Sequence, residues 1–262
     1  MRWALVTGAS AGIGAQICRE LAGRGFNLVL VARREGRLRE VADQLTAAHR
    51  IDTRVVAADL AAPRAAQDLH AAVRALGLDI EVLVNNAGLL YNGYFDETAL
   101  DKQQDLLAVN VVALTALTHL FLADMLDRGR GRILNVASTA AWVGIPQQNV
   151  YSASKAYVLS FTLALANELR SKTRAVTATA LCPSFTATTM LDNPEQGAKL
   201  SVPSALIMDP EVVAREGVAA CLRGDPVVTP GLSNRVSMGL VQVAPRRWAT
   251  AALGWAYRRA QS

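Results

Sequence analysis

A tyrosine and a lysine stand four positions apart in the second half of the chain and form a chemically useful pair. Tyr151 and Lys155 lie near the start of a predicted long helix, where residues i and i+4 share one face. A phenol has an unperturbed pKa of about 10, and a nearby ammonium group favours its ionised form. General acid–base catalysis works best with a pKa near the working pH. We therefore expect Tyr151 to exchange a proton with a substrate oxygen and Lys155 to lower the pKa of the phenol.

Two further polar residues are placed where they can serve the same reaction. Ser138 follows a predicted strand, and its hydroxyl either hydrogen-bonds a substrate oxygen or caps a turn. Asn110 lies inside a predicted apolar helix, where a buried amide needs hydrogen-bond partners. It is either a satisfied core amide or an interruption of the helix that holds a water connected to Lys155. These two residues complete the candidate catalytic set.

A glycine-rich loop near the beginning of the chain has the composition of a phosphate-binding turn. It runs Thr7-Gly8-Ala9-Ser10-Ala11-Gly12-Ile13-Gly14 between a predicted strand and a predicted helix. Glycines allow a tight turn and the close approach of a pyrophosphate, and the helix N-terminus adds free N–H donors. The spacing GxxxGxG differs from the GxGxxG of the standard dinucleotide fingerprint. We expect the phosphates of a dinucleotide to be bound by Gly8, Ser10, Gly12, Ile13 and Gly14.

The end of the second predicted strand indicates which dinucleotide binds. NAD sites place an acid there for the ribose 2′-hydroxyl, whereas NADP sites place an arginine near the 2′-phosphate. The strand is followed by Arg33 and Arg34 and by no acid at that point. A guanidinium group offers a charge-assisted fork to a phosphate. The sequence therefore predicts NADP(H) rather than NAD(H), and the alternative is an ordinary solvated helix start.

Strand-like and helix-like segments alternate along the chain and position these residues. Strand–helix alternation implies parallel strands joined by right-handed crossovers, hence a doubly wound, Rossmann-like three-layer α/β sandwich of about seven parallel strands. Such sheets bind ligands at the carboxyl ends of their strands, where each motif above falls or just precedes a helix. The predicted strands are 3–7, 27–32, 53–57, 80–84, 132–137, 175–181 and 227–229, and the predicted helices are 12–24, 34–49, 65–76, 100–128, 150–170 and 211–223.

One catalytic domain, residues 1–244, is predicted to contain all of these elements. Within it, residues 184–208 have weak periodicity, few charges and several Met and Leu side chains, which suits a lid over an apolar or aromatic substrate. Residues 245–262 combine four arginines with Trp248 and Trp255 at helical spacing. This tail either packs on the lid or a sister subunit, or touches a membrane surface weakly as a basic amphipathic helix.

Composition argues against several other classes of protein. A net charge of +5 comes without a groove-reading motif, so no nucleic-acid partner is expected. The three cysteines and three histidines are scattered, which predicts no metal site and no disulfide framework. A strand at the very start leaves no room for a signal peptide and favours the cytoplasm. Residues 106–123 are mostly apolar, and we interpret them as a core helix, with a membrane span as the alternative.

Taken in order, these motifs resemble those of the short-chain dehydrogenase/reductase family over residues 1–229. The resemblance implies hydride transfer between a nicotinamide and a carbonyl or alcohol. It implies that Tyr151 donates the proton and that Lys155 binds the nicotinamide ribose. It further implies that Ser138 steadies the substrate and that Asn110 completes a proton relay through water.

The same resemblance assigns residues around the cofactor. Asp59 and Leu60 are expected to border the adenine, and the motif Asn85-Asn86-Ala87-Gly88 places Asn86, Ala87 and Gly88 in the cofactor cleft. Pro183 and Thr186 are expected at the nicotinamide end. There the chain departs from the family, because Ser184 replaces a common glycine, which leaves open whether Thr186 or Thr188 contacts the nicotinamide amide.

The function expected from these features is an NADPH-dependent reductase of a ketone, a 3-oxoacyl thioester or a steroid-like compound. Two alternatives remain on the same scaffold: an imine reductase, or a non-catalytic NADP(H)-binding sensor. The intact set of Ser138, Tyr151 and Lys155 weighs against the sensor, which needs no proton donor. The helices 100–128 and 150–170 are expected to pair between subunits in a homodimer or homotetramer.

Overall fold

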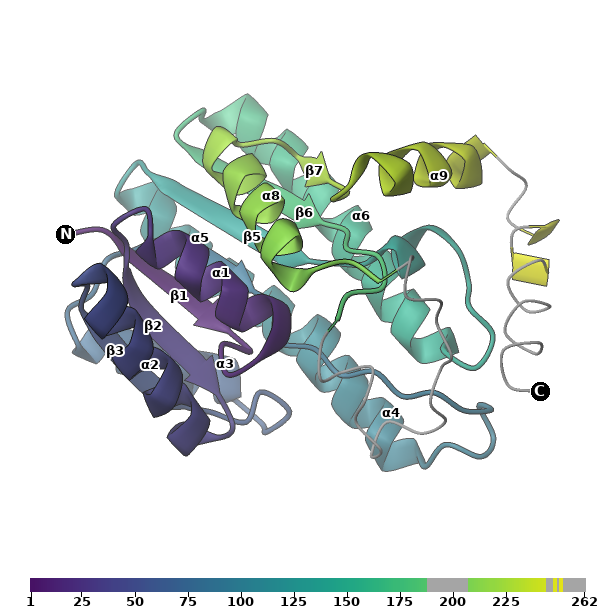
Figure 1. The fold of residues 1–262 in the computed structure, drawn as a ribbon, viewed down its shortest axis with the longest axis horizontal. Helices are drawn as coiled ribbons and strands as arrows, with labels where there is room; N and C mark the ends of the chain where they lie inside the picture. Colours follow the sequence, from purple (N-terminus) through teal and green to yellow (C-terminus); the bar gives the residue numbers. More distant parts are fainter. Residues whose placement is uncertain (188–206, 244–246, 249, 252–262) are drawn as a thin grey trace.

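A seven-stranded parallel sheet forms the centre of the molecule (Figure 1). The structure is a computed structural model that describes residues 1–187, 207–243, 247–248 and 250–251. The strand order is β3-β2-β1-β4-β5-β6-β7, and every neighbouring pair is parallel. The prediction of a doubly wound α/β sheet is confirmed. The strands are β1 Trp3–Thr7, β2 Asn27–Ala32, β3 Thr53–Ala57, β4 Ile80–Asn85, β5 Gly131–Val136, β6 Val176–Leu181 and β7 Val227–Val228.

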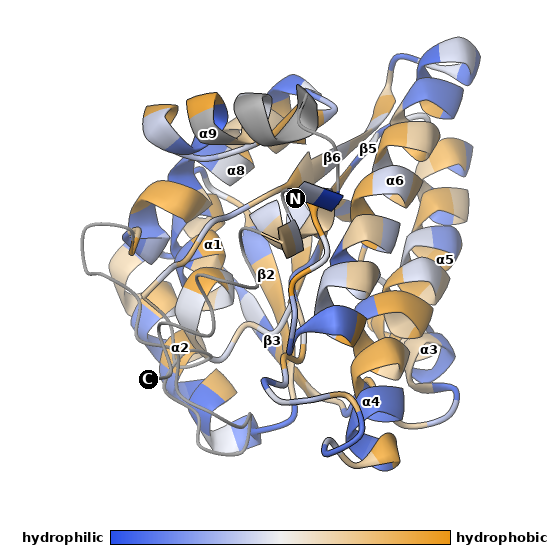
Figure 2. Cartoon of the chain, turned by 90° about the vertical axis from the view of Figure 1, so that its right-hand side faces the viewer, coloured by the Kyte–Doolittle hydropathy of each residue, from blue (hydrophilic) through white to orange (hydrophobic). Residues whose placement is uncertain are grey.

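Helices cover both faces of the sheet and bury a separate core on each. Successive strand side chains point to opposite faces, so Ala4 and Val6 belong to one core while Trp3 and Leu5 belong to the other. Apolar residues on the strands lie between the two helical layers (Figure 2). The first core packs against α1 Gly12–Ala22, α2 Glu35–His49 and α8 Pro210–Arg223, and the second against α3 Ala65–Ala75, α5 Leu114–Asp127 and the end of α6 Asn149–Lys172.

The predicted helix 100–128 is interrupted near its middle. It consists of α4 Leu100–Leu107, the π-helical turn η1 Ala108–Ala113 and α5. The run from Leu100 to Asp127 is long and apolar enough to cross a membrane by length and composition, and 44% of its apolar window is buried inside the protein. Leu117 and Phe121 pack in the core of the sheet, as expected for a core helix.

The described part of the chain also contains a helix that the sequence did not predict. Helix α9 spans Leu232–Val243 and lies beside the short 3-10 helix η2, Thr139–Trp142. Of the predicted lid, the two described ends are joined by a parallel bridge between Thr186 and Met208. Most of that lid, and most of the predicted tail 245–262, lie outside the described residues.

Candidate active site

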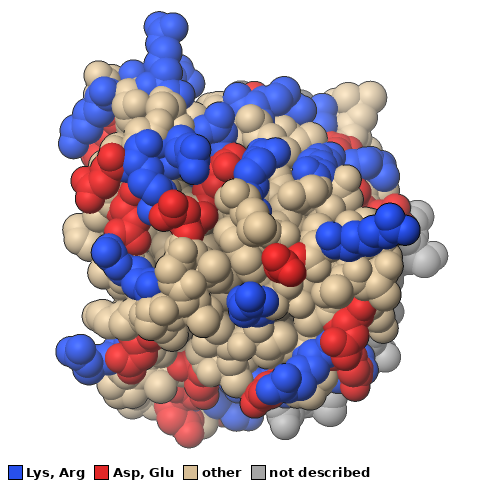
Figure 3. All heavy atoms as spheres, turned by 90° about the vertical axis from the view of Figure 1, so that its left-hand side faces the viewer, with Lys and Arg blue, Asp and Glu red and all other residues tan. Residues whose placement is uncertain are grey.

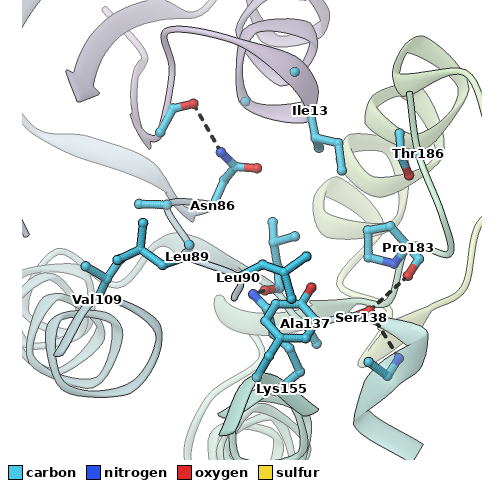
Figure 4. Close-up of a pocket in the computed structure, with 18 of the residues that line it drawn as sticks. Ile13, Asn86, Leu89, Leu90, Val109, Ala137, Ser138, Lys155, Pro183 and Thr186 are labelled. Carbon is cyan, nitrogen blue, oxygen red and sulfur yellow. Dashed lines mark hydrogen bonds between the residues drawn. The ribbon is translucent and has the colours of Figure 1, made fainter. Parts of the chain in front are cut away.

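One cavity of about 980 Å³ runs along the carboxyl ends of the central strands (Figure 4). All of the predicted site residues line it except Asn110, which lies behind it. The lining includes Gly8, Ser10, Gly12, Ile13, Gly14, Arg33, Arg34, Asp59, Leu60, Asn86, Ala87, Gly88, Ser138, Tyr151, Lys155, Pro183 and Thr186. Within the described residues, no group of three or more His, Cys, Asp and Glu side chains is placed to hold a metal ion.

The glycine loop at the start of α1 cannot hold larger residues. Gly8 and Gly12 have φ values of +67° and +55°, in the left-handed region that favours glycine. A Cβ atom on Gly14 would lie 2.2 Å from the carbonyl oxygen of Gly8 and 2.5 Å from Nδ2 of Asn86. The N-cap residue Ala11 makes no side-chain cap, so the first N–H groups of α1 stay available to an anion. These residues fit the pyrophosphate of a dinucleotide.

Asn86 ties the glycine loop to the end of β4. Its Nδ2 donates to the carbonyl oxygens of Thr7 at 2.9 Å and Gly8 at 3.3 Å. In return, Oγ1 of Thr7 accepts from the backbone N–H groups of Asn86 and Ala87, each at 3.0 Å. The two strand ends are therefore locked together, which keeps the floor of the cavity rigid.

Two arginines at the end of β2 are available to a ligand. Arg33 and Arg34 are exposed and line the cavity, and within the described residues their guanidinium groups make no ion pair or hydrogen bond. The next two arginines are paired, since Arg37 bonds Glu40 and Arg39 bonds Glu35. On the face drawn in Figure 3, basic and acidic side chains are mixed.

Helix α6 presents Tyr151 and Lys155 to the cavity one turn apart. Nζ of Lys155 lies 5.7 Å from the centroid of the Tyr151 ring and donates to the carbonyl oxygen of Val136 at 2.8 Å. Ser138 lines the same cavity. It also caps η2, since its Oγ accepts from the N–H of Ala140 at 3.1 Å. The serine therefore caps a turn and lines the cavity at the same time.

Burial controls the protonation of this pair. It raises the pKa of Tyr151 above its usual value, and a hydrogen bond with the Ser138 side chain only partly opposes the rise. Burial also lowers the pKa of Lys155 from 10.5 to about 8, with the sulfur of Cys182 opposing the change. The expected lowering of the phenol pKa is therefore not found in the protein alone, because desolvation raises this pKa. The phenol is neutral, which is the form that donates a proton.

Asn110 sits in the π-helical turn behind Gly88. Its Oδ1 accepts from the N–H of Leu89 at 2.8 Å, and its Nδ2 donates to Leu89 O at 3.0 Å and Ser154 Oγ at 3.1 Å. The residue thus both interrupts the helix and is a satisfied amide. A Cβ on Gly88 would lie 3.3 Å from Oδ1 of Asn110 and 3.5 Å from Nζ of Lys155. The glycine therefore leaves room for both side chains to approach the main chain at this point, and the water relay stays a prediction.

The loop after β6 forms the wall of the cavity near Ser138. Thr186 is buried and its Oγ1 donates to the carbonyl oxygen of Ser184 at 2.9 Å. Oγ of Ser138 donates to the carbonyl oxygen of Pro183 at 3.4 Å (Figure 4). Thr186 also lines the cavity, whereas Thr188 lies outside the described residues.

The cavity beyond Tyr151 is walled by residues that the sequence did not single out for this site. They come from four separate segments: the loop after β4, the loop between η2 and α6, the segment after Pro183, and α9. Phe185 had been assigned only to the lid, and no motif marks the others. They are Leu89, Leu90, Tyr91, Val143, Ile145, Gln148, Phe185 and Met238.

Comparison with known proteins agrees with this geometry. Residues 2–199 match the family model described as short chain dehydrogenase. The chain is 36% identical over 222 residues to a very-long-chain 3-oxoacyl-CoA reductase of Anas platyrhynchos, covering 82% of this chain and 67% of the relative. It is 34% identical over 222 residues to inactive hydroxysteroid dehydrogenase-like protein 1 of Pongo abelii, covering 83% and 65%.

A solved structure is similar over almost the whole chain. It is a short-chain dehydrogenase from Sphingobium yanoikuyae in complex with NADPH, with a TM-score of 0.81, 27% sequence identity, and coverage of 94% of this chain and 97% of that one. By contrast, the matched region spans only 52% to 72% of the length of the curated relatives.

Proposed function

Since the chain belongs to the short-chain dehydrogenase/reductase family, we propose that it is an NADPH-dependent reductase that turns a carbonyl compound into an alcohol. The observation that carries this proposal is the convergence of Ser138, Tyr151 and Lys155 on one cavity. That cavity also contains the free N-terminus of α1. A nucleotide pyrophosphate and a reducible substrate therefore have adjoining places.

The protein's own groups orient the substrate and supply the proton. NADPH, when bound, supplies a hydride to the carbonyl carbon. The hydroxyl of Ser138 and the phenol of Tyr151 would meet the carbonyl oxygen, and the neutral phenol would release its Oη proton to that oxygen. Lys155 keeps a positive charge beside the ring at pH values below about 8, which stabilises the phenolate left behind.

The preference for NADPH over NADH rests on Arg33 and Arg34. Both guanidinium groups are available at the strand end where the 2′-phosphate of NADP is bound in related folds. The β2 strand ends without an acid to take a ribose 2′-hydroxyl. The structure from Sphingobium yanoikuyae, which contains NADPH, supports this choice.

The substrate we propose is a ketone, a 3-oxoacyl thioester or a steroid-like compound. Most side chains in the wall beyond Tyr151 are apolar, among them Leu90, Val143 and Met238, and apolar walls bind apolar ligands. The relatives named as a 3-oxoacyl-CoA reductase and a hydroxysteroid dehydrogenase-like protein support these classes.

A homodimer or homotetramer is also part of the proposal. Exposed apolar side chains gather on α4, η1 and α6, where Leu107, Val112 and Tyr157 are each at least 40% exposed. Such a patch commonly marks a protein–protein interface. Light scattering during gel filtration measures the mass directly, and a monomer would contradict this part of the proposal.

Following NADPH absorbance over a panel of ketones and imines tests the function. We expect oxidation of NADPH with ketones and little with imines. Preferential turnover of imines would make the enzyme an imine reductase. No turnover together with tight NADPH binding would instead favour the sensor, a role that the relative named as inactive keeps open.

A further inference from the structure

One polar side chain close to the catalytic tyrosine, that of Gln148, has no role in the mechanism above. Gln148 is the N-cap residue of α6, three positions before Tyr151, and both residues line the same cavity. It is only 5% exposed yet lines the cavity. A buried amide needs hydrogen-bond partners, so the contacts of the Gln148 side chain call for an explanation.

Hydrogen bonds join the loop after β4 to the loop before α6 at this glutamine. We call the two contacts, Gln148–Asn92 and Gly93–Gln147, the clasp. Nε2 of Gln148 donates to Oδ1 of Asn92, which follows β4. The N–H of Gly93 donates to the carbonyl oxygen of Gln147 at 3.0 Å. Gln147 has a φ of +64°, a conformation that a residue other than glycine adopts only when its surroundings hold it there. The clasp therefore fixes where the Gln148 side chain points.

The clasp leaves one end of the amide without a partner. Within the described residues, Oε1 of Gln148 accepts no hydrogen bond, while Nε2 is engaged by Asn92. Three residues that line the cavity with it, Leu90, Val143 and Ile145, are apolar and offer no side-chain donor. An acceptor on a cavity-lining residue with no protein donor is a place for a donor on the ligand.

We propose that Gln148 selects the substrate of this enzyme, held by Asn92 so that its amide oxygen accepts a hydrogen bond from a hydroxyl or N–H group on the substrate. This inference rests on the proposed reductase function and narrows it to carbonyl compounds with a donor close to the reacting carbon. Asn92 is a positioning residue, since it acts through Gln148.

Three matched ketones test the assignment: β-hydroxypropiophenone has a donor, β-methoxypropiophenone has only an acceptor at the same place, and butyrophenone has neither. For the wild type we expect kcat/KM to be about tenfold higher for the hydroxyketone than for either of the others, as for one buried hydrogen bond. Gln148→Met keeps the length of the side chain and removes the acceptor, so kcat/KM should become about equal for the three ketones.

Asn92 variants separate orientation from simple structural damage. Asn92→Asp keeps the acceptor for Nε2 and should retain the preference for the hydroxyketone. Asn92→Ala frees the amide to turn and donate, so relative activity on the methoxyketone should rise. NADPH affinity is measured for every variant, and we expect it to stay within about twofold because Gln148 and Asn92 lie outside the nucleotide end.

The outcomes distinguish two failures. If the wild type reduces all three ketones equally, or if Gln148→Met keeps the preference, the role of Gln148 is wrong while the reductase function stands. If none of the ketones is reduced although NADPH binds, the proposed function fails and this inference fails with it.

Discussion

The two ends of the cavity are built in different ways. At the nucleotide end, Gly8, Gly14 and Asn86 are in contact through main-chain atoms and one amide, so the shape depends on the absence of side chains. At the substrate end, Val143, Phe185 and Met238 come from segments far apart in the chain, so the shape depends on which side chains are present. The nucleotide end suits one fixed ligand, the dinucleotide, whereas single substitutions can change the shape of the substrate end.

The glycine loop should give the largest effect. In Gly14→Ala the new Cβ meets the carbonyl oxygen of Gly8, so we expect the Kd for NADPH to rise by at least about a hundredfold. Gly36→Ala is the matched control, because a Cβ there meets no atom within 4 Å. Fluorescence titration with NADPH measures both, and unchanged binding in Gly14→Ala would mean that the nucleotide end is not sterically defined.

Lys155→Met should lose activity and gain stability. We expect kcat/KM to fall by about a hundredfold or more. A pKa lowered from 10.5 to about 8 corresponds to about 3 kcal/mol of cost near neutral pH. The lost hydrogen bond to Val136 offsets about 1 kcal/mol, which leaves a net gain of about 2 kcal/mol in the free energy of unfolding.

The pH dependence checks the same lysine. The unfolded chain holds this proton up to about pH 10.5 and the folded protein only to about pH 8, so Lys155 makes the wild type more stable as pH rises between these values. Burial raises the pKa of Cys18, Cys182 and Cys221 from 9.0 to about 12, which lowers stability above pH 9 in every variant. The free energy of unfolding that Lys155→Met gains over the wild type, measured in urea, should therefore shrink as pH rises from about 8 to about 10.5, while the difference between Lys172→Met and the wild type stays constant. Reductase activity should fall as pH rises through about 8, and a flat profile would contradict the charged role.

Arg33 should give a smaller effect, confined to one cofactor. In Arg33→Ala we expect the KM for NADPH to rise about 10- to 100-fold, as for a lost charge-assisted hydrogen bond, with little change for NADH. Arg37→Ala is the control, since Arg37 is paired with Glu40. An equal effect on both cofactors would mean that Arg33 does not bind the 2′-phosphate of NADPH.

Substitution of Met238, at the substrate end of the cavity, should give the smallest effect. Its side chain lines the cavity from α9, so Met238→Ala should change the KM for a bulky ketone by about two- to fivefold and leave the KM for NADPH unaltered. Val236→Ala, on the same helix but 60% exposed, should change neither constant. A shift in the NADPH constant would show that the two ends are not separable.

The difference between the two ends also explains what the sequence could predict. Strand β2 was predicted with its observed ends because both of its faces are buried and its residues are almost all apolar. The glycine loop was predicted because its residues are adjacent in the chain. The π-helical turn at Asn110 was raised only as an alternative, since it arises from packing against Leu89 and Ser154.

The substrate end escaped prediction because no local pattern encodes it. Helix α9 has glycine and serine within an irregular apolar pattern, so it lacked a helical signature. Gln148 stands in a loop that only the fold brings against Asn92. The raised pKa of Tyr151 was missed because it comes from burial, which a motif does not reveal, and the hydrogen bond with Ser138 only partly opposes it.

In the proposed reaction the phenol of Tyr151 supplies the proton, while the nucleotide end binds NADPH independently of it. Measuring kcat and the NADPH Kd on one preparation of Tyr151→Phe tests both statements together. We expect kcat to fall by about a thousandfold while the Kd stays within about twofold of wild type. A variant that reduces ketones at the wild-type rate would mean that another group supplies the proton.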